Sequence, residues 1–229
     1  MARLIAWLGG GVFVASLALC TWWFIVPLGV ETPFRGWQPL VANALLLTVF
    51  AAHHSLFARP WVQRRLTVID PLLQRSSYVW LASLLFIAVI LLWIPVGGVA
   101  YRLEGPLAWI AIGVQLAGVW MIVESVRGLD ALELAGIRQV ITVASSSDRR
   151  PLQVGGPYGW VRHPLYLGWM LALFASPRMT GDRLAFAALT SFYLVIAVPW
   201  EEASLRQSFG ESYRRYERNV RWRIVPYLY

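Results

Sequence analysis

The sequence contains no lysine, has a single cysteine and is poor in charged residues of any kind. Charged side chains make up 14% of its 229 residues and hydrophobic ones 58%, whereas a soluble domain usually carries about a quarter charged residues. We therefore expect lipid to surround most of the chain. The lone cysteine, Cys20, lies in an apolar run and excludes an internal disulfide.

The net charge is +8, and arginine supplies all of the positive charges because lysine is absent. The arginines stand in short segments between apolar runs, which is typical of membrane topology signals and not of a nucleic-acid-binding face. If Arg3 is cytoplasmic, sixteen of the 20 arginines fall on the cytoplasmic side. The four on the other side are Arg35, Arg102, Arg178 and Arg183. We predict a bacterial inner-membrane protein with both termini and the segment 124–164 in the cytoplasm.

Six apolar stretches predict the fold: 5–29, 39–58, 77–99, 106–123, 165–177 and 184–200. The first four approach the ~20 residues of a membrane-spanning helix. The first is also too long for a cleaved signal, and its Gly9–Gly11 run suits helix packing better than a dinucleotide loop. The last two are short and predict a tight helical hairpin. No strand-like alternation is sustained, so we predict an all-α integral membrane bundle of about six membrane helices, followed by a C-terminal amphipathic cytoplasmic helix.

A glycine- and proline-rich segment, 155–168, precedes the fifth apolar run. Pro164 suits the first turn of a helix and makes His163 a plausible cap. The amides of residues 165–167 would then lack intrahelical partners and, with Arg162 nearby, would favour an anionic group. An ordinary interfacial helix start explains the same pattern equally well.

A second polar segment, 201–216, has the spacing of an amphipathic helix. Its apolar stripe consists of Leu205, Phe209, Tyr213, Tyr216 and, beyond it, Val220. Glu202 lies on this stripe and Glu201 to its side, so Glu202 needs a partner if the stripe is buried. Arg206, one turn later, offers a purely structural partner. A cationic ligand or Arg162 offers a functional one.

Asn43 and His54 are eleven residues apart in the second apolar run and share a helix face. Polar and ionisable groups inside a membrane are candidates for functional sites, so we treat both as candidate substrate residues. Hydration at the membrane interface is the alternative. The chain has three histidines without a nearby cluster of cysteines or carboxylates, so we predict no metal site.

Taken together, three motifs resemble the isoprenylcysteine carboxyl methyltransferase and phospholipid methyltransferase superfamily of membrane enzymes. They are Arg162-His-Pro-x-Tyr166-x-Gly168, Glu201-Glu202-x-x-Leu205 and Phe209-Gly210-x-x-Tyr213-x-x-Tyr216. The N-terminal half is similar to the methanethiol S-methyltransferase and NnrU-type branch at His54-Ser-Leu-Phe-Ala-Arg-Pro60, Arg75-Ser-Ser-Tyr78 and Gly136-Ile-Arg-Gln139. The segment 128–135 departs from that branch, because it lacks the histidine and aromatic residues expected before Gly136.

This resemblance implies a methyltransferase that binds S-adenosylmethionine at the cytoplasmic end and takes a small apolar or lipidic acceptor from the membrane. It implies that four residues contact the cofactor and that two lie nearest the chemistry: His163, Tyr166, Gly168 and Glu201, and Arg162 and Glu202. Residues 1–124 would form the substrate and membrane part, and residues 125–229 the cofactor site.

We rank a small or hydrophobic thiol first as acceptor, because a thiol yields a nucleophilic thiolate readily. A nearby Arg162 would stabilise that thiolate. A prenylcysteine-type carboxylate ranks second and a phospholipid amine third. The alternative is a non-enzymatic NnrU-type membrane protein whose motifs act as helix caps and interfacial anchors.

Overall fold

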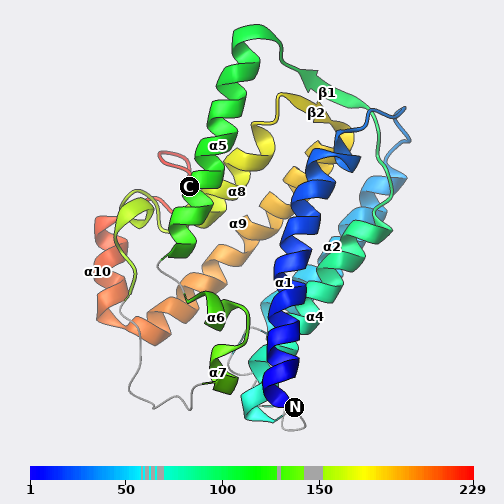
Figure 1. Ribbon diagram of the computed structural model, residues 1–229. Helices are drawn as coiled ribbons and strands as arrows, with labels where there is room; N and C mark the ends of the chain where they lie inside the picture. The colour runs from blue at the N-terminus through cyan, green and yellow to red at the C-terminus, as the bar shows by residue number, and fades with distance from the viewer. Residues whose placement is uncertain (58, 60–61, 63–64, 66–69, 128–129, 142–151) are drawn as a thin grey trace. The chain divides into compact units, whose positions relative to one another are not determined.

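The computed structural model describes the whole chain except residues 58, 60–61, 63–64, 66–69, 128–129 and 142–151. Helices dominate the described residues, and five are long and apolar enough to cross a membrane (Figure 1). These are α1 Ala2–Ile25, α2 Gln38–Phe57, α4 Pro71–Leu92, α5 Gly105–Arg127 and α9 Gly181–Phe209. The shorter elements are η1 Pro27–Gly29, α6 Ala131–Leu134, α7 Arg138–Ile141, η2 Gly156–Gly159, α8 Pro164–Phe174 and α10 Glu211–Asn219. The prediction of an all-α integral membrane bundle is confirmed.

Two predicted helices have different bounds in the structure. The last apolar run is not short, because α9 extends over 29 residues and includes Pro199. Its polar continuation at 201–206 stays helical since the charged side chains there find partners within the chain. The predicted amphipathic helix 201–216 is divided at Gly210, whose φ of 56° lies in the left-handed region and interrupts the helix.

A small sheet is also present where the sequence predicted no strand. β1 Val99–Arg102 pairs with β2 Arg178–Thr180, and the Leu103 amide donates to the Pro177 carbonyl at 2.8 Å. These strands are too short to show the alternation on which the prediction relied. Of the arginines used to predict orientation, Arg64, Arg149 and Arg150 lie outside the described residues.

The chain forms two compact units. Unit 1 comprises Met1–Gly98, Asp130–Asp148 and Thr180–Asp182, and unit 2 comprises Val99–Leu129, Arg149–Met179 and Arg183–Tyr229. Unit 1 therefore holds α1, α2, α4, α6 and α7, whereas unit 2 holds α5, α8, nearly all of α9, and α10. The predicted division into a substrate part and a cofactor part at residue 124 stays a prediction.

In unit 1, α1 packs closely on α4 and α7 through its glycines. The indole Nε1 of Trp80 donates to the Ile5 carbonyl at 2.9 Å. A Cβ on Gly9 would lie 2.6 Å from that same Nε1, and a Cβ on Gly10 would lie 2.7 Å from Cδ1 of Ile137. The absence of a side chain at these two positions lets the elements approach, as small residues do between membrane helices. The expected packing role is confirmed for Gly9 and Gly10, whereas a Cβ on Gly11 would meet nothing within 4 Å.

The non-helical segment after α4 is held by two buried polar side chains of unit 1. The Asn43 amide donates to the Ile94 carbonyl at 2.7 Å and accepts from the Ile94 amide at 2.9 Å. Asp182 accepts from the Trp93 indole and from the amides of Val96 and Gly97, at 2.8 to 3.0 Å. Irregular backbone at membrane depth requires such internal partners. Asn43 therefore stabilises the chain itself.

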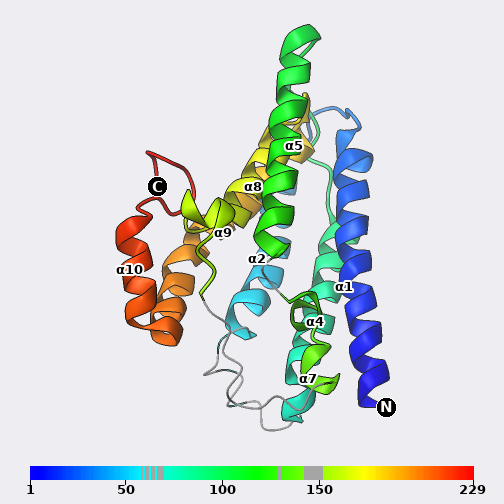
Figure 2. The same cartoon turned by 60° about the vertical axis from the view of Figure 1, so that its left-hand side comes forward.

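In unit 2, α5 and α8 cross at a pair of glycines. A Cβ on Gly118 would lie 2.5 Å from the Ala172 amide nitrogen, and one on Gly168 would lie 2.7 Å from the Gly118 carbonyl oxygen. Gln115 reinforces the crossing, because its side-chain nitrogen donates to the Ala172 carbonyl at 2.7 Å. At the C-terminal end of α9 the chain turns back, and α10 lies beside that end of α9 (Figure 2).

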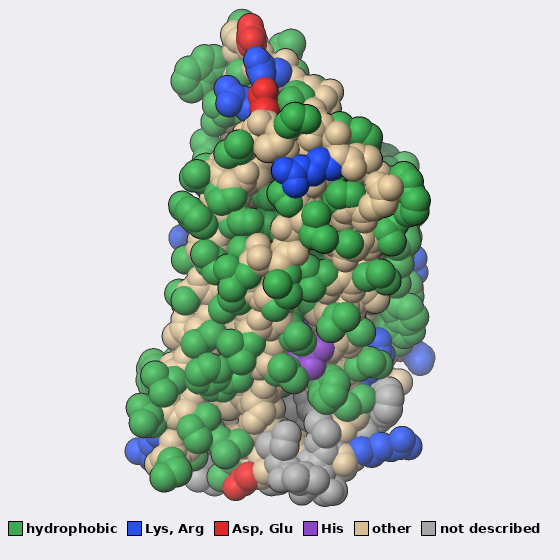
Figure 3. Space-filling model, turned by 90° about the vertical axis from the view of Figure 1, so that its right-hand side faces the viewer, with side chains coloured by type: hydrophobic (Ala, Val, Ile, Leu, Met, Phe, Trp, Pro, Cys, Tyr) green, Lys and Arg blue, Asp and Glu red, His purple; other side chains and the backbone are tan. Residues whose placement is uncertain are grey.

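Large apolar side chains on the long helices are exposed, among them Leu91 on α4, Trp109 on α5 and Phe192 on α9. In the face drawn in Figure 3, hydrophobic side chains cover the middle and most charged side chains gather toward the ends. Exposed apolar surface of this extent is unfavourable in water and favourable in lipid. The chain is therefore an integral membrane protein.

We expect Gly118→Ala to destabilise the protein by about 1–3 kcal/mol, because the added methyl would overlap the backbone of α8. Gly113→Ala on the same helix is the matched control, since a Cβ there meets nothing within 4 Å. Thermal unfolding of both variants in detergent, followed by tryptophan fluorescence, measures the difference. Equal melting temperatures for the two variants would contradict the close crossing of α5 and α8.

Candidate active site

The first turn of α8 is shaped by the predicted cap and proline. His163 is the N-cap and Pro164 occupies the first helical position. The Tyr166 amide donates to the His163 carbonyl at 3.0 Å, and the Leu167 amide donates to the same oxygen at 3.2 Å. The expectation of amides without intrahelical partners at residues 165–167 is therefore wrong for Tyr166 and Leu167, because the helix begins with a tightened turn.

The C-terminal tail runs alongside the residues that precede α8. The amides of Arg162 and His163 donate to the carbonyls of Trp222 and Arg223, at 2.9 and 2.7 Å. The Nη1 atom of Arg162 donates to the carbonyls of Val220 and Arg221, at 2.9 and 3.0 Å. Arg162 is thus buried and anchors the tail through both its backbone and its side chain.

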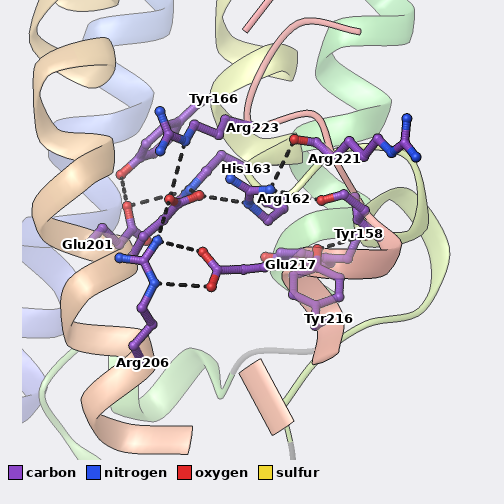
Figure 4. Close-up of polar contacts among 12 residues, drawn as sticks. Tyr158, Arg162, His163, Tyr166, Glu201, Arg206, Tyr216, Glu217, Arg221 and Arg223 are labelled. Carbon is purple, nitrogen blue, oxygen red and sulfur yellow. Dashed lines mark hydrogen bonds and ion pairs between the residues drawn. The ribbon is translucent and has the colours of Figure 1, made fainter. Parts of the chain in front are cut away.

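Glu202 is the centre of a charged cluster in unit 2. Figure 4 shows three members of this cluster, Arg162, Arg206 and Arg223, converging from different segments. The Glu202 carboxylate is fully buried and accepts from Nε of Arg162 at 2.7 Å. It also lies 3.3 Å from Nη2 of Arg206, 3.3 Å from Nε of Arg223, and 3.5 Å from Nε2 of His163. Both partners that the sequence left open, Arg206 and Arg162, therefore contact Glu202 at once.

Glu217 extends this cluster onto α10. Nε and Nη2 of Arg206 donate to its two carboxylate oxygens, at 3.0 and 2.6 Å. This two-bond geometry is the strongest form of an arginine–carboxylate pair. Sequence reasoning missed Glu217 and Arg223, and Glu217 does not lie on the apolar stripe that indicated Glu202. The pair holds the end of α9 against α10.

Glu201, Tyr166 and His163 form the more open side of the same cluster. The Tyr166 hydroxyl donates to Oε2 of Glu201 at 2.5 Å, and Nδ1 of His163 lies 3.7 Å from that oxygen. The His163 ring stacks on the Tyr166 ring with centroids 5.2 Å apart. The Glu201 side chain is 43% exposed, whereas the buried His163 ring has its Nε2 atom 3.5 Å from Glu202. A carboxylate open to a ligand therefore lies beside a buried imidazole that contacts both glutamates.

Three tyrosines, two on α10 and one in η2, lie next to the charged cluster. Tyr216 donates to the Tyr158 carbonyl at 2.7 Å, and Tyr158 donates to the Ser125 carbonyl at 3.3 Å. Burial raises the pKa of Tyr213 and of Tyr216, and the nearby Glu202 charge raises both further. Burial also raises the pKa of Tyr158. All three phenols therefore remain neutral. Tyr158 and Tyr216 donate hydrogen bonds, whereas the buried Tyr213 hydroxyl has no hydrogen-bond partner among the described residues.

The other predicted site residues lie elsewhere. Gly168 lies at the crossing of α5 and α8, where its missing side chain makes room for Gly118 and Ile122. Asn43 and His54 belong to unit 1, where Nδ1 of His54 lies 2.9 Å from the Tyr78 hydroxyl. In the described part of the chain, no three His, Cys, Asp or Glu side chains gather as potential metal ligands.

The N-terminal motifs converge within unit 1. The Ser76 hydroxyl donates to the Gly136 carbonyl at 3.0 Å, and Nε of Arg75 donates weakly to the Glu133 carbonyl at 3.4 Å. Gly136 has a φ of 71°, and a Cβ there would lie 3.0 Å from Cα of Ser76. This position therefore requires glycine both for its conformation and for the close approach to α4.

Glu202→Gln should destabilise the protein by about 3–5 kcal/mol, because it leaves the buried Arg162 without its carboxylate. Glu201→Gln should change stability by less than about 1 kcal/mol, because that side chain is partly solvated. Thermal unfolding of the two variants in the same detergent compares them directly. A melting temperature for Glu202→Gln at or above that of Glu201→Gln would show that the cluster does not hold the fold.

Comparison with curated proteins finds similarity over nearly the whole chain. Methanethiol S-methyltransferase 2 of Bradyrhizobium diazoefficiens is 34% identical over 215 residues, which cover 90% of this chain and 81% of the relative. The methanethiol S-methyltransferase of Mycobacterium tuberculosis is 33% identical over 187 residues, covering 80% of this chain and 77% of the relative. Nurim of Bos taurus is 30% identical over 189 residues, covering 77% of this chain and 72% of the relative. No protein-family model matches the chain, and no solved structure matches it.

Proposed function

The chain belongs to the methanethiol S-methyltransferase family, and on this premise we propose that it transfers a methyl group from S-adenosylmethionine to a small thiol. The similarity to named methanethiol S-methyltransferases carries the proposal, because it covers up to 90% of the chain and both sets of motifs. The non-enzymatic NnrU-type alternative is not favoured, because relatives named methanethiol S-methyltransferase match 80% to 90% of the chain.

We propose that the methyl donor binds on the open side of the cluster in unit 2. S-adenosylmethionine, when bound, supplies an activated methyl group on a cationic sulfonium. The partly exposed Glu201 carboxylate would attract that cation, and partial desolvation would strengthen the attraction. The Tyr166 hydroxyl orients the Glu201 carboxylate, and Nδ1 of His163 lies on the same side, 3.7 Å from Glu201. We propose these three residues as the donor-binding group.

Arg162 and Glu202 support this group from behind. Both side chains are buried, and Arg162 already donates to Glu202 and to two carbonyls of the tail. We therefore propose that they position His163 and the tail around the donor, and that Arg162 acts on the acceptor through its charge. Gly168 contributes by letting α8 pack on α5, which sets the place of Tyr166. Methyl transfer depends chiefly on such alignment and on exclusion of water.

A thiol is the acceptor that the family favours and the chemistry supports. Six curated relatives are named methanethiol S-methyltransferase, from 31% to 34% identical to this chain. A thiol also forms a nucleophilic thiolate more readily than an alcohol does. The prenylcysteine-type carboxylate remains the second candidate and the phospholipid amine the third.

The proposal is tested by supplying methyl-labelled S-adenosylmethionine to the purified protein with each acceptor class in turn. We expect label in dimethyl sulfide when methanethiol is supplied, and in the corresponding methyl sulfides with longer alkyl thiols. Calorimetry should show binding of S-adenosylmethionine and of its demethylated product with similar, micromolar affinity, because both contain the same adenosine and amino-acid groups. Label in a carboxyl ester or a phospholipid, with thiols unmodified, would overturn the choice of acceptor.

Three glutamate variants serve as matched controls for the donor site. Glu202→Gln should reduce turnover most, because it disturbs the buried core of the cluster. Glu201→Gln should chiefly weaken donor binding. Glu211→Gln should change neither, since this glutamate is exposed on α10 and pairs only with Arg218 among the described residues. Equal, mild effects of all three would refute the assignment of the donor site.

We also propose that both termini and the donor site face the cytoplasm of a bacterial inner membrane, as the arginine distribution favours. Because the native Cys20 is buried, single cysteines can report the orientation. In intact cells of a bacterial host, a membrane-impermeant maleimide should label Arg35→Cys. Arg214→Cys should react only after the membrane is permeabilised. The reverse labelling pattern would contradict the proposed orientation.

A further inference from the structure

His53, in unit 1, is a buried histidine that makes no hydrogen bond within the described part of the chain. It lies one turn before the end of α2 and is 7% exposed. Neither Nδ1 nor Nε2 has a hydrogen-bond partner among the described residues. A neutral imidazole offers one donor and one acceptor, and leaving both unmade in a buried place is unfavourable. An ionisable side chain at membrane depth in this condition points to a ligand.

Aromatic rings cover both this imidazole and its neighbour. His53 stacks with Phe57 at a centroid distance of 4.8 Å and with Tyr78 at 5.6 Å. His54 stacks with Phe50 at 5.6 Å. The faces of the His53 ring are thus in contact with apolar surface, so its two nitrogens, at the ring edge, are the positions where a partner can bind.

The Tyr78 ring, which packs against both histidines, is held in place by residues of the N-terminal motifs. The Tyr78 hydroxyl lies 2.9 Å from Nδ1 of His54 and donates to the His54 carbonyl at 3.3 Å. The Arg75 guanidinium lies over the Tyr78 ring, with Cζ 5.0 Å from the centroid. His54 was the histidine predicted from sequence to meet a substrate. The structure gives His54 a hydrogen-bonding partner, Tyr78, whereas its neighbour His53 has none among the described residues.

We propose that the edge of His53, between Phe57 and Tyr78, is a binding subsite for the small apolar thiol. This inference rests on the proposed function for the identity of the ligand. The thiol S–H donates to one imidazole nitrogen of His53, and the sulfur contacts the rings. Sulfur–aromatic contacts are favourable, and the S–H is a weak donor suited to a single acceptor. A buried water would need two to four polar partners, which the aromatic walls do not supply.

Nuclear magnetic resonance of the full-length protein in detergent, labelled with ¹⁵N-histidine, tests binding directly. The chain has three histidines, so the three imidazole signals can be assigned by single substitutions. Without any methyl donor present, methanethiol should shift the His53 signal in a saturable way. Dimethyl sulfide, which lacks the S–H group, should not. A His53 signal that does not move with methanethiol up to millimolar concentrations overturns the proposal.

Kinetics of His53→Phe give a second readout, because phenylalanine keeps the ring stack and removes both nitrogens. We expect the KM for the thiol to rise roughly tenfold, as for the loss of one buried hydrogen bond. The KM for the donor should be unchanged and kcat should stay within about twofold. Thr48→Val on the same helix is the control, since its hydroxyl donates to the Ala44 carbonyl, away from the subsite. An unchanged thiol KM in His53→Phe also overturns the proposal.

The two proposals fail separately. If the protein methylates no thiol yet methanethiol still shifts the His53 signal, the subsite holds and the proposed function fails. If thiols are methylated while the His53 signal and the thiol KM stay unchanged, the function holds and the subsite is wrong.

Discussion

The burial of the Glu202 carboxylate is the constraint on which the rest of unit 2 depends. A buried charge is tolerated only when it is paired and hydrogen-bonded. Here three guanidinium groups and an imidazole approach it, from Arg162, Arg206, Arg223 and His163. Those partners come from the start of α8, from α9 and from the C-terminal tail. One carboxylate thereby brings together the segments that carry the proposed donor-binding group.

The two halves of the family resemblance correspond to two separate structural clusters. The C-terminal motifs gather around Glu202 in unit 2, whereas the N-terminal motifs join α2, α4 and the Gly136 turn in unit 1. Each cluster contains a buried histidine. His163 lies between Glu201 and Glu202, whereas the ring nitrogens of His53 have no hydrogen-bond partner among the described residues. Polar groups of this kind are costly in a protein otherwise suited to lipid, and both proposed ligand sites rest on them.

Several predicted site residues have a structural role, and the sequence motifs could not distinguish such a role from a functional one. Gly168 belongs to a motif that implied cofactor contact, yet its environment is the backbone of α5 at Gly118. Asn43 is used fully by the backbone of Ile94. A motif records which residue types are required at given positions. Whether the requirement is packing, capping or binding is decided by what the helix faces.

The sequence by itself determined the first four long membrane helices, the cap at His163 and the need of Glu202 for a partner. These follow from local properties: the length of apolar runs, the geometry of proline and the 3.6-residue period. Even Arg206 could be predicted as a partner, because it lies one turn from Glu202 on the same helix. Only the tertiary structure decided that α9 is long, that Arg162, Arg223 and Glu217 complete the cluster, and that His53, not His54, lacks a hydrogen-bond partner among the described residues. Those choices depend on the rotation of packed helices and on the path of the C-terminal tail, which bring together side chains distant in sequence.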